Sequence, residues 1–528
     1  MKKFKKVLAV MLSLAMVLGM SLTAFAEDHT PVETDSASIT VNGVKTGATV
    51  KAYKIAGGKW NDQGFIGYEA LEVGGIKIAD VSNPTADEIT GIANAVRNDP
   101  NIEGTELDES PAGVYTKELV VGEYLIVVTK NGADDTTIYN PMVTSVYYST
   151  EKSGDKNDQI GGIVSANDNF VVDGEIAYAK HEDPTIDKKI LDPGSGNNKG
   201  DDTAIGDDIH FEITTAFPAY SNAYTTAEFN IIDTLSAGLT LSPDSVIVER
   251  VGKDTDAPEK GTDYTVSVDG QKMTIAFTSS FILGHRGDAV TVHYTAKLNE
   301  NAGINFDKNT NTVYAEYTNN PTTNDTGTTE EKKTYHYTFG IDAGINGSGS
   351  EVTKEVYKIN ENGEVKVVEA EKDRVEVTGP LAGATFELRT KDGIVVKEVV
   401  SADDGSLKMT GLDAGEYILV ETKAPEGYSL DATEHTFVIT ASYNEDGTLA
   451  EYTITVDGKN STYKATYNNE KEPTITYEEV ASLGIKNTKL ASLPSTGGIG
   501  TTIFTIGGCL IMVVAAALFF ASRRKSAK

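Results

Sequence analysis

Three residue types that are costly to bury occupy core-facing strand positions in the middle of the chain. Strand alternation places Lys188 on one face with Ile186 and Ile190, and it places Asp233 on the apolar face of a second strand. Asn311 has the same kind of position on the closing strand of this block. Burial favours the neutral amine of a lysine and the protonated form of a carboxyl group. A neutral amine beside an asparagine side-chain carbonyl, with an acid to move protons, can form an amide and release ammonia.

The last third of the chain repeats this combination. Alternation puts Lys358, Glu421 and Asn487 on apolar strand faces, again in the order lysine near the first strand, acid within, asparagine on the last. Taken singly, each residue would lie on the surface if its strand phase were assigned wrongly. Because the same three residue types occur in the same order in two blocks, we favour the interpretation that they are buried and form an amide bond. Such a domain would act once upon itself, so the sequence predicts maturation rather than an enzyme, and no cofactor.

The expected bonds would close long loops. They run over 123 residues from 188 to 311 and over 129 residues from 358 to 487. By analogy with a disulfide of that loop length, each would stabilise the fold by about 4–5 kcal/mol. A pulling force could not extend the chain between the joined residues.

Three blocks of strand-like alternation must position these residues. They cover about 37–148, 186–317 and 335–489, and residues 85–96 of the first block predict one short helix with Thr85 as its N-cap. The expected fold class is all-β, with tandem immunoglobulin-like antiparallel β-sandwiches. We expect domains over 27–178, 179–333 and 334–490. The first block shows no comparable trio, and we predict no amide bond there.

Charge and composition disfavour several function classes. A formal net charge of −32 opposes binding to nucleic acid or to anionic lipid. Cys509 is the only cysteine, so no disulfide can brace the body of the chain. The seven histidines show no metal-ligand spacing, so we expect no metal site. A secreted hydrolase is disfavoured because the sequence has no Gly-x-Ser-x-Gly motif.

Both ends of the chain carry targeting patterns. Residues 1–26 join a basic start, an apolar centre and Ala24-Phe25-Ala26, which is typical of a signal peptide cut before Glu27, with a retained membrane anchor as the alternative. Near the other end, Leu493-Pro494-Ser495-Thr496-Gly497 precedes an apolar segment over 499–521 and a basic tail. That segment is long enough to span a bilayer.

The pentapeptide, apolar segment and basic tail together resemble the cell-wall sorting signal of Gram-positive surface proteins. The resemblance implies that a sortase cuts between Thr496 and Gly497 and passes the Thr496 carbonyl to an amine. Residues 491–528 are then the sorting signal, and the protein is expected outside the cell, covalently anchored to the wall. An ordinary single-span anchor would explain the last two parts but not the pentapeptide.

Two blocks resemble Cna-type domains. The middle block resembles a CnaA-like domain, which implies a Lys188–Asn311 bond with Asp233 as the catalytic acid. The run Tyr417–Tyr428 resembles the E-box of CnaB-type isopeptide domains, and Leu381–Leu388 resembles an early strand of that family.

The CnaB resemblance carries its own expectations. It implies a Lys358–Asn487 bond with Glu421 as the catalytic acid. The family keeps its lysine closer to the Leu-x-Gly-Ala strand than this chain does, so Lys354 remains a competing candidate.

Residues 171–181 resemble the pilin motif of sortase-assembled pili. The family pattern is a tyrosine, usually a proline, and a lysine, which correspond here to Tyr178, Ala179 and Lys180. The resemblance implies that the Lys180 amine attacks the acyl-enzyme formed at Thr496 of another subunit, which yields a head-to-tail covalent fibre. An ordinary interdomain lysine is the alternative. An acceptor lysine must be exposed, unlike Lys188.

Almost the whole chain resembles the major (backbone) pilins of Gram-positive sortase-assembled pili. The expected function is that of a pilus shaft subunit, and a wall-anchored adhesin or tip pilin with a sandwich stalk is the alternative. The expected partners are a class C (pilus) sortase, a housekeeping sortase, other copies of the chain, minor pilins, peptidoglycan and host surface receptors.

Overall fold

The computed structural model describes residues 30–130, 132, 136–150, 159–160, 162–166, 168–251, 257–323, 325–348, 353–359, 365–372, 377–467, 473–478 and 483–489. The predicted signal peptide and sorting signal lie outside this part of the chain. The chain divides into two compact units, one with residues up to 201, 206–302 and 308–336, and the other with 202–205, 303–307 and 337 onward. Within the described ranges, no helix is long and apolar enough to cross a membrane.

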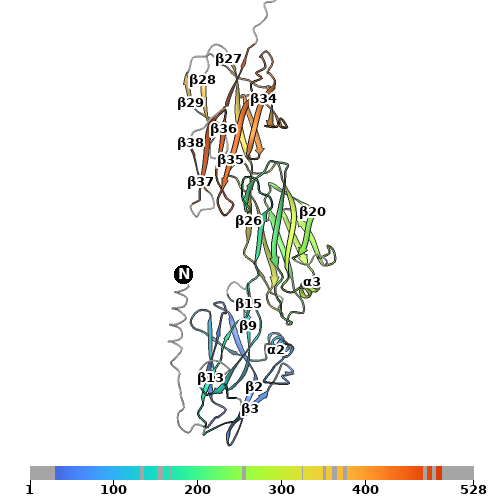
Figure 1. The fold of residues 1–528 in the computed structure, drawn as a ribbon, viewed down its shortest axis with the longest axis vertical. Coiled ribbons are helices and arrows are strands. Elements are labelled where there is room, and N and C mark those ends of the chain that lie inside the picture. The colour runs from blue at the N-terminus through green and yellow to red at the C-terminus, as the bar shows by residue number, and fades with distance from the viewer. Residues whose placement is uncertain are drawn as a thin grey trace, which may run out of the picture. The chain divides into compact units, whose positions relative to one another are not determined.

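The first part of the chain folds into two main sheets (Figure 1). One sheet has the order β14 (Ile176–Tyr178), β1 (Ser36–Asn42), β8 (Val114–Val120), β7 (Asp108–Glu109). The other has the order β12 (Val164–Ser165), β3 (Gly64–Ala70), β2 (Thr49–Asn61), β9 (Gly122–Lys130), β11 (Met142–Ser149), β13 (Val171–Gly174), with β6 (Thr105–Glu106) paired to β2. Two short pairs are β4 (Glu72–Val73) with β5 (Ile76–Lys77) and β10 (Ile138–Tyr139) with β15 (His181–Glu182).

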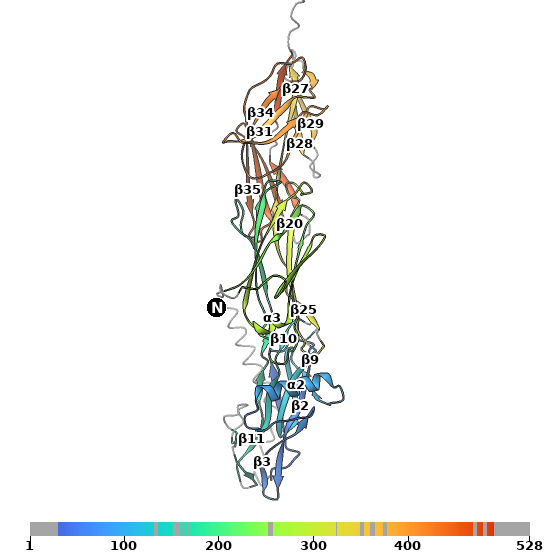
Figure 2. The same cartoon turned by 90° about the vertical axis from the view of Figure 1, so that its right-hand side faces the viewer.

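The predicted helix is present as α2 (Ala86–Asn98), and Figure 2 shows it over the sheet that contains β2 and β9. Thr85 and Glu88 form a capping box that satisfies free backbone N–H groups at the helix start. Ile92, Ala93 and Val96 are buried against β2 and β9. The sequence-based prediction of this helix and of its N-cap is therefore confirmed.

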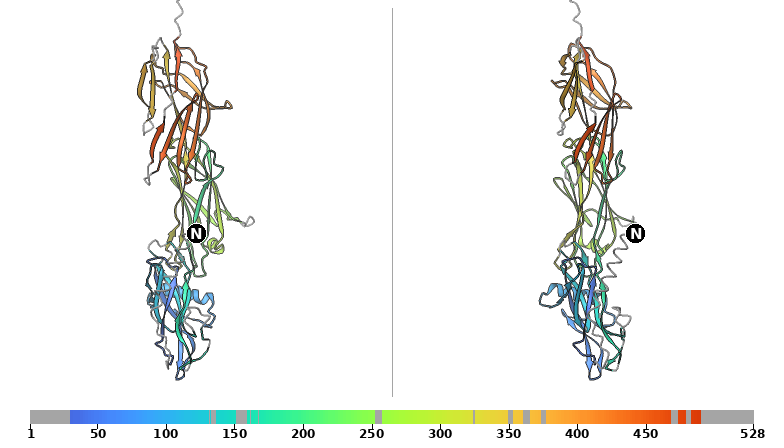
Figure 3. Two further views of the ribbon diagram at one scale, coloured as in Figure 1. Left: turned by 60° about the vertical axis from the view of Figure 1, so that its left-hand side comes forward. Right: turned by 90° about the vertical axis from the view of Figure 1, so that its left-hand side faces the viewer.

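The middle strands form a second pair of sheets, drawn in green to yellow tones in Figure 3. One sheet has the order β16 (Ile186–Ile190), β18 (Asp208–Ala216), β23 (Ala289–Leu298), β20 (Leu239–Arg250). The other has the order β17 (Gly200–Asp202), β26 (Lys332–Tyr337), β24 (Asn309–Thr318), β19 (Phe229–Leu235), β22 (Lys272–Phe277), β21 (Tyr264–Asp269), with β25 (Thr326–Thr328) paired to β24. A short helix, α3 (Ser279–Gly284), follows β22 and was not predicted from the sequence.

The second compact unit contains the remaining strands. A four-stranded sheet has the order β30 (Val377–Pro380), β27 (Phe339–Ser348), β33 (Ser406–Leu412), with β39 (Leu483–Thr488) also paired to β27. A seven-stranded sheet has the order β32 (Val395–Val400), β31 (Thr385–Thr390), β34 (Gly415–Lys423), β35 (His435–Tyr443), β36 (Leu449–Val456), β37 (Lys459–Thr466), β38 (Thr474–Glu478). A separate hairpin joins β28 (Thr353–Ile359) and β29 (Val365–Lys372).

The all-β sandwich class is confirmed, but the expectation of purely antiparallel sheets is wrong in two places. β1 pairs in parallel with β14, and β27 pairs in parallel with β39. Parallel pairing needs partners far apart in sequence, because a tight turn can join only antiparallel strands. The alternation of residues within one strand does not indicate whether that strand pairs in parallel or antiparallel.

Candidate functional site

The middle domain brings Lys188, Asp233 and Asn311 together between its two sheets. Lys188 lies on β16 of one sheet, while Asp233 and Asn311 lie on the adjacent strands β19 and β24 of the other. Asn311 pairs with Leu235, so it sits one inward-facing position along from Asp233. Inward-facing residues of two packed sheets meet in the core, which is how residues far apart in sequence converge here.

A hydrogen-bonded cluster joins these three side chains to Tyr294 of β23. Lys188 Nζ donates to Asp233 Oδ2 and, at 2.5 Å, to the Tyr294 hydroxyl. The Tyr294 hydroxyl donates to Asp233 Oδ2 at 3.0 Å, and Asn311 Nδ2 donates to the Tyr294 hydroxyl at 2.7 Å. The Lys188 and Asp233 side chains are 0 % exposed, so the cluster is sealed from water.

Burial shifts both charged partners toward their neutral forms. Desolvation lowers the pKa of Lys188 to about 8, against the opposing effect of Asp233. Desolvation likewise raises the pKa of Asp233, although Lys188 and Tyr294 counteract the shift. The same desolvation lowers the pKa of His336, which lies near Lys188, to about 3. Both shifts make the neutral amine, the form that can act as a nucleophile, easier to reach than for an exposed lysine.

Two oxygens of the cluster have no hydrogen-bond partner within the described part of the chain. These are Asp233 Oδ1 and Asn311 Oδ1. Buried polar atoms are normally paired, and an unpaired one in a native fold points to a chemical role or to strain. The Asn311 amide carbonyl thus makes no hydrogen bond within the buried cluster that also holds the Lys188 amine and the Asp233 carboxyl group.

Aromatic rings surround the lysine amine. Lys188 Nζ lies 5.1 Å from the centroids of both Phe211 and Tyr294, and the two rings stack at 5.0 Å. His336 packs edge-on against Phe211. This apolar wall excludes water and so produces the desolvation that lowers the pKa of the lysine.

Sequence reasoning did not assign a role to Tyr294. The residue shares a strand face with Val290 and Val292, so its pattern predicts an ordinary core aromatic. Its residue type did carry one signal: a buried tyrosine hydroxyl usually has a hydrogen-bond partner, which indicates a polar group nearby in the core.

In the second unit the structure brings together Glu421 and Asn487. Asn487 Nδ2 donates to Glu421 Oε1 at 2.6 Å and to the Ser429 carbonyl at 3.1 Å. Glu421 Oε2 accepts from the Asp431 amide at 2.6 Å. Both side chains are buried, so the predicted acid and asparagine form a preorganised pair.

Asn487 lies on β39, and the partner of this strand is β27. β27 pairs with β39, and Ile345 and Gly347 stand opposite Ile485 and Asn487. Lys358 instead lies on β28, which pairs with β29, and its side chain lies outside the described residues, as does that of Lys354. Lys358 therefore lies on the strand that follows β27 in the chain, and the Lys358–Asn487 bond stays a prediction.

Lys180 is exposed, directly after β14 and before β15. The Asn140 amide donates to its backbone carbonyl at 3.1 Å, and the Ala179 amide donates to the Asn42 carbonyl at 2.8 Å. The backbone around this exposed lysine is thus held by hydrogen bonds from two neighbouring segments. This arrangement contrasts with that of Lys188, which is buried.

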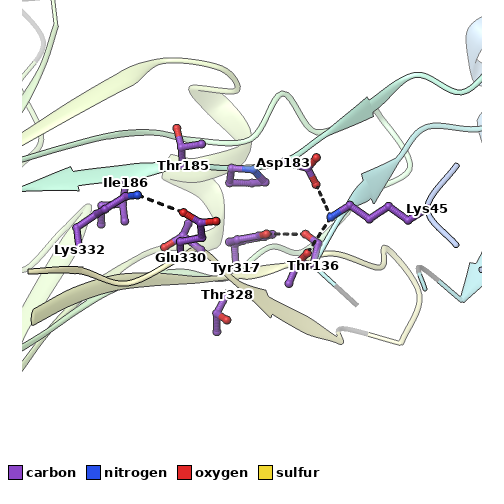
Figure 4. Close-up of a pocket in the computed structure, with 11 residues that line it drawn as sticks. Lys45, Thr136, Asp183, Thr185, Ile186, Tyr317, Thr328, Glu330 and Lys332 are labelled. Atoms are coloured by element: carbon purple, nitrogen blue, oxygen red, sulfur yellow. Dashed lines mark hydrogen bonds and ion pairs between the residues drawn. The ribbon is translucent and has the colours of Figure 1, made fainter. Parts of the chain in front are cut away.

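A cavity of about 520 Å³ is lined in part by Asp183, three residues after Lys180 (Figure 4). Lys45 Nζ lies 3.1 Å from Asp183 Oδ1, and the Tyr317 hydroxyl donates to the Thr136 carbonyl at 2.5 Å. Glu330 and Lys332 form a further ion pair at 3.2 Å. The residues that line this cavity include none of the predicted site residues.

Four family models match consecutive parts of the chain. Residues 34–180 match a T6 antigen Ig-like domain, and 205–321 match the Gram-positive pilin backbone subunit 2, Cna-B-like domain. Residues 366–455 match a prealbumin-like fold domain, and 485–528 match the LPXTG cell wall anchor motif. The middle match is described as Cna-B-like, whereas the sequence resemblance noted above was to a CnaA-like domain.

Similar proteins agree with these matches. The trypsin-resistant surface T6 protein of Streptococcus pyogenes serotype M6 is 28% identical over 98% of this chain and 99% of its own length. Fimbrial subunit type 2 of Actinomyces naeslundii is 23% identical over 85% of this chain and 77% of its own length. The solved T6 backbone pilin of serotype M6 Streptococcus pyogenes has a TM-score of 0.60 at 21% identity, covering 88% of this chain and 100% of that chain, which shows a shared fold.

The immunoglobulin-like sheets and the anchor motif define a cell-wall-anchored surface protein. More narrowly, the chain is similar along almost its whole length to a T6 surface protein, and its middle part matches a domain of Gram-positive pilin backbone subunits. The LPXTG cell wall anchor motif indicates a sortase substrate.

Proposed function

We propose that the protein forms the pilus shaft through an amide between Lys180 of one subunit and Thr496 of the next. The exposed amine of Lys180 on a fixed backbone is the observation that carries this proposal. The role is structural rather than enzymatic. A class C sortase would make the subunit-to-subunit bond, and a housekeeping sortase would transfer the finished fibre to peptidoglycan. Minor pilins and host surface receptors are the further proposed partners.

Mass spectrometry of digested wall extracts tests the linkage directly. The expected product is a branched peptide in which Lys180 Nζ is bonded to the Thr496 carbonyl. A branched peptide that contains a different lysine would overturn the assignment of Lys180. Extracts with Thr496 bonded only to wall amines would favour the wall-anchored adhesin or tip pilin.

A second part of the proposal is an internal amide between Lys188 and Asn311. The buried cluster with Asp233 supports it. The Lys188 nitrogen would bond to Cγ of Asn311, the bond from Cγ to Nδ2 would break, and ammonia would leave. This amide would join the two sheets of the middle domain.

For the last domain we retain the Lys358–Asn487 amide as a separate proposal, with Glu421 as the acid. The contact between Glu421 and Asn487 supports it. Lys358→Arg is expected to retain one ammonia that the unsubstituted protein loses, as measured by intact mass. Retention of that ammonia in Lys354→Arg, and not in Lys358→Arg, would assign the bond to Lys354. Loss in both variants would contradict both lysines.

A further inference from the structure

We propose that the Tyr294 hydroxyl is a catalytic group in the formation of the Lys188–Asn311 amide, where it carries a proton to the departing ammonia. This inference rests on the internal bond proposed above. Within the cluster, the hydroxyl contacts the nucleophile, the acid and the leaving group: Lys188 Nζ at 2.5 Å, Asp233 Oδ2 at 3.0 Å and Asn311 Nδ2 at 2.7 Å.

Amide formation requires a proton to move between two nitrogens. The Lys188 nitrogen must lose a proton as it bonds to Cγ, and Nδ2 of Asn311 must gain one before it can leave as ammonia. An amide nitrogen is a donor in the ground state, as Nδ2 is here toward the hydroxyl oxygen. Once Cγ becomes tetrahedral, this nitrogen has a free lone pair and can accept a proton.

The hydroxyl can complete this transfer without a net change in its own state. It gives its proton to Nδ2 and takes one from the Lys188 nitrogen, directly or through Asp233 Oδ2. One C–N bond forms, one C–N bond breaks, and one proton passes from lysine to ammonia. Asp233 Oδ2 contacts both the lysine amine and the hydroxyl, so the acid and the tyrosine form one relay.

The ring of Tyr294 is held independently of its hydroxyl. It stacks on Phe211 with an interplanar angle of 15°, and the two residues are directly paired across β18 and β23. A phenylalanine at this position keeps the ring contacts and removes only the oxygen. This makes Tyr294→Phe a selective probe of the relay.

Timed intact-mass analysis of the full chain, made by cell-free synthesis, provides the test. Tyr294→Phe is expected to slow the loss of one ammonia by about 10²-fold or more, the usual contribution of a general acid–base group. The matched control is Tyr264→Phe, a buried tyrosine of β21 in the same domain, which should lose ammonia at the unsubstituted rate.

Two further measurements separate chemistry from folding. In an Asn311→Ala background, where no bond can form, Tyr294→Phe should change the Tm little. Fluorotyrosine at position 294 keeps the ring but makes the hydroxyl more acidic, and it should alter the rate and its pH profile. If Tyr294→Phe loses ammonia at the rate of the unsubstituted chain, the relay is overturned, while the proposal of a Lys188–Asn311 bond still stands. No ammonia loss from Lys188–Asn311 in the unsubstituted chain would overturn the proposed bond and the relay with it.

Discussion

Replacing Asp233 by alanine should leave the middle domain with the ammonia that the unsubstituted protein loses. The carboxyl group contacts both Lys188 and Tyr294, so its removal takes away the acid that the proton transfer needs. The loop between residues 188 and 311 would then stay open, which should lower the Tm by roughly 10–20 °C for a loss of about 4–5 kcal/mol. Intact mass and differential scanning calorimetry measure the two effects.

Two variants control this experiment. Asp288→Ala removes an acid of the same domain that pairs with Arg250 away from the cluster, and its ammonia loss should be unchanged. The double variant Lys188→Met/Asp233→Leu removes both buried charges, so it isolates the loss of the covalent loop from the cost of an unpaired buried group. Full ammonia loss in Asp233→Ala would contradict the assigned role of the acid.

The second large effect concerns assembly. Lys180→Arg should abolish the ladder of high-mass species in boiled wall extracts while monomer remains on the wall, because a guanidinium stays protonated and cannot act as the nucleophile. Immunoblots of fractionated extracts measure both species.

Lys189→Arg is the matched control for this substitution. Lys189 is partly exposed and lies nine residues further along the chain, where it pairs with Glu212 at 2.6 Å. Its substitution should leave the ladder intact. A persistent ladder in Lys180→Arg would assign the linkage to another amine.

Strand alternation was sufficient to find the middle cluster. The period of two identifies inward-facing residues on each strand, and a two-layer sandwich then brings those residues into one core. Lys188, Asp233 and Asn311 were predictable for this reason, and the structure places all three in contact with Tyr294. Tyr294 itself gave no distinct signal, because an aromatic residue on a strand face with Val290 and Val292 has the same pattern whether its hydroxyl is used or not.

The last domain shows what strand alternation leaves undetermined. Lys358 alternates with apolar residues as a core strand would, but β28 belongs to a hairpin with β29. β27 and β30 flank this hairpin in the sequence and pair with each other. Alternation shows which residues share a face of a strand, but it does not show which strand is the partner. A strand of an inserted hairpin therefore has the same sequence pattern as a core strand.

The parallel pairing of β27 and β39 has a mechanical consequence. The chain enters this domain at the start of β27 and leaves it at the end of β39, so tension pulls the two neighbouring strands in opposite directions along their length. Six consecutive residue pairs, from Ala343 with Leu483 to Ser348 with Thr488, must then yield in shear together rather than open one after another. Resistance to stretching is therefore present in the backbone ladder of this domain before any side chain is joined.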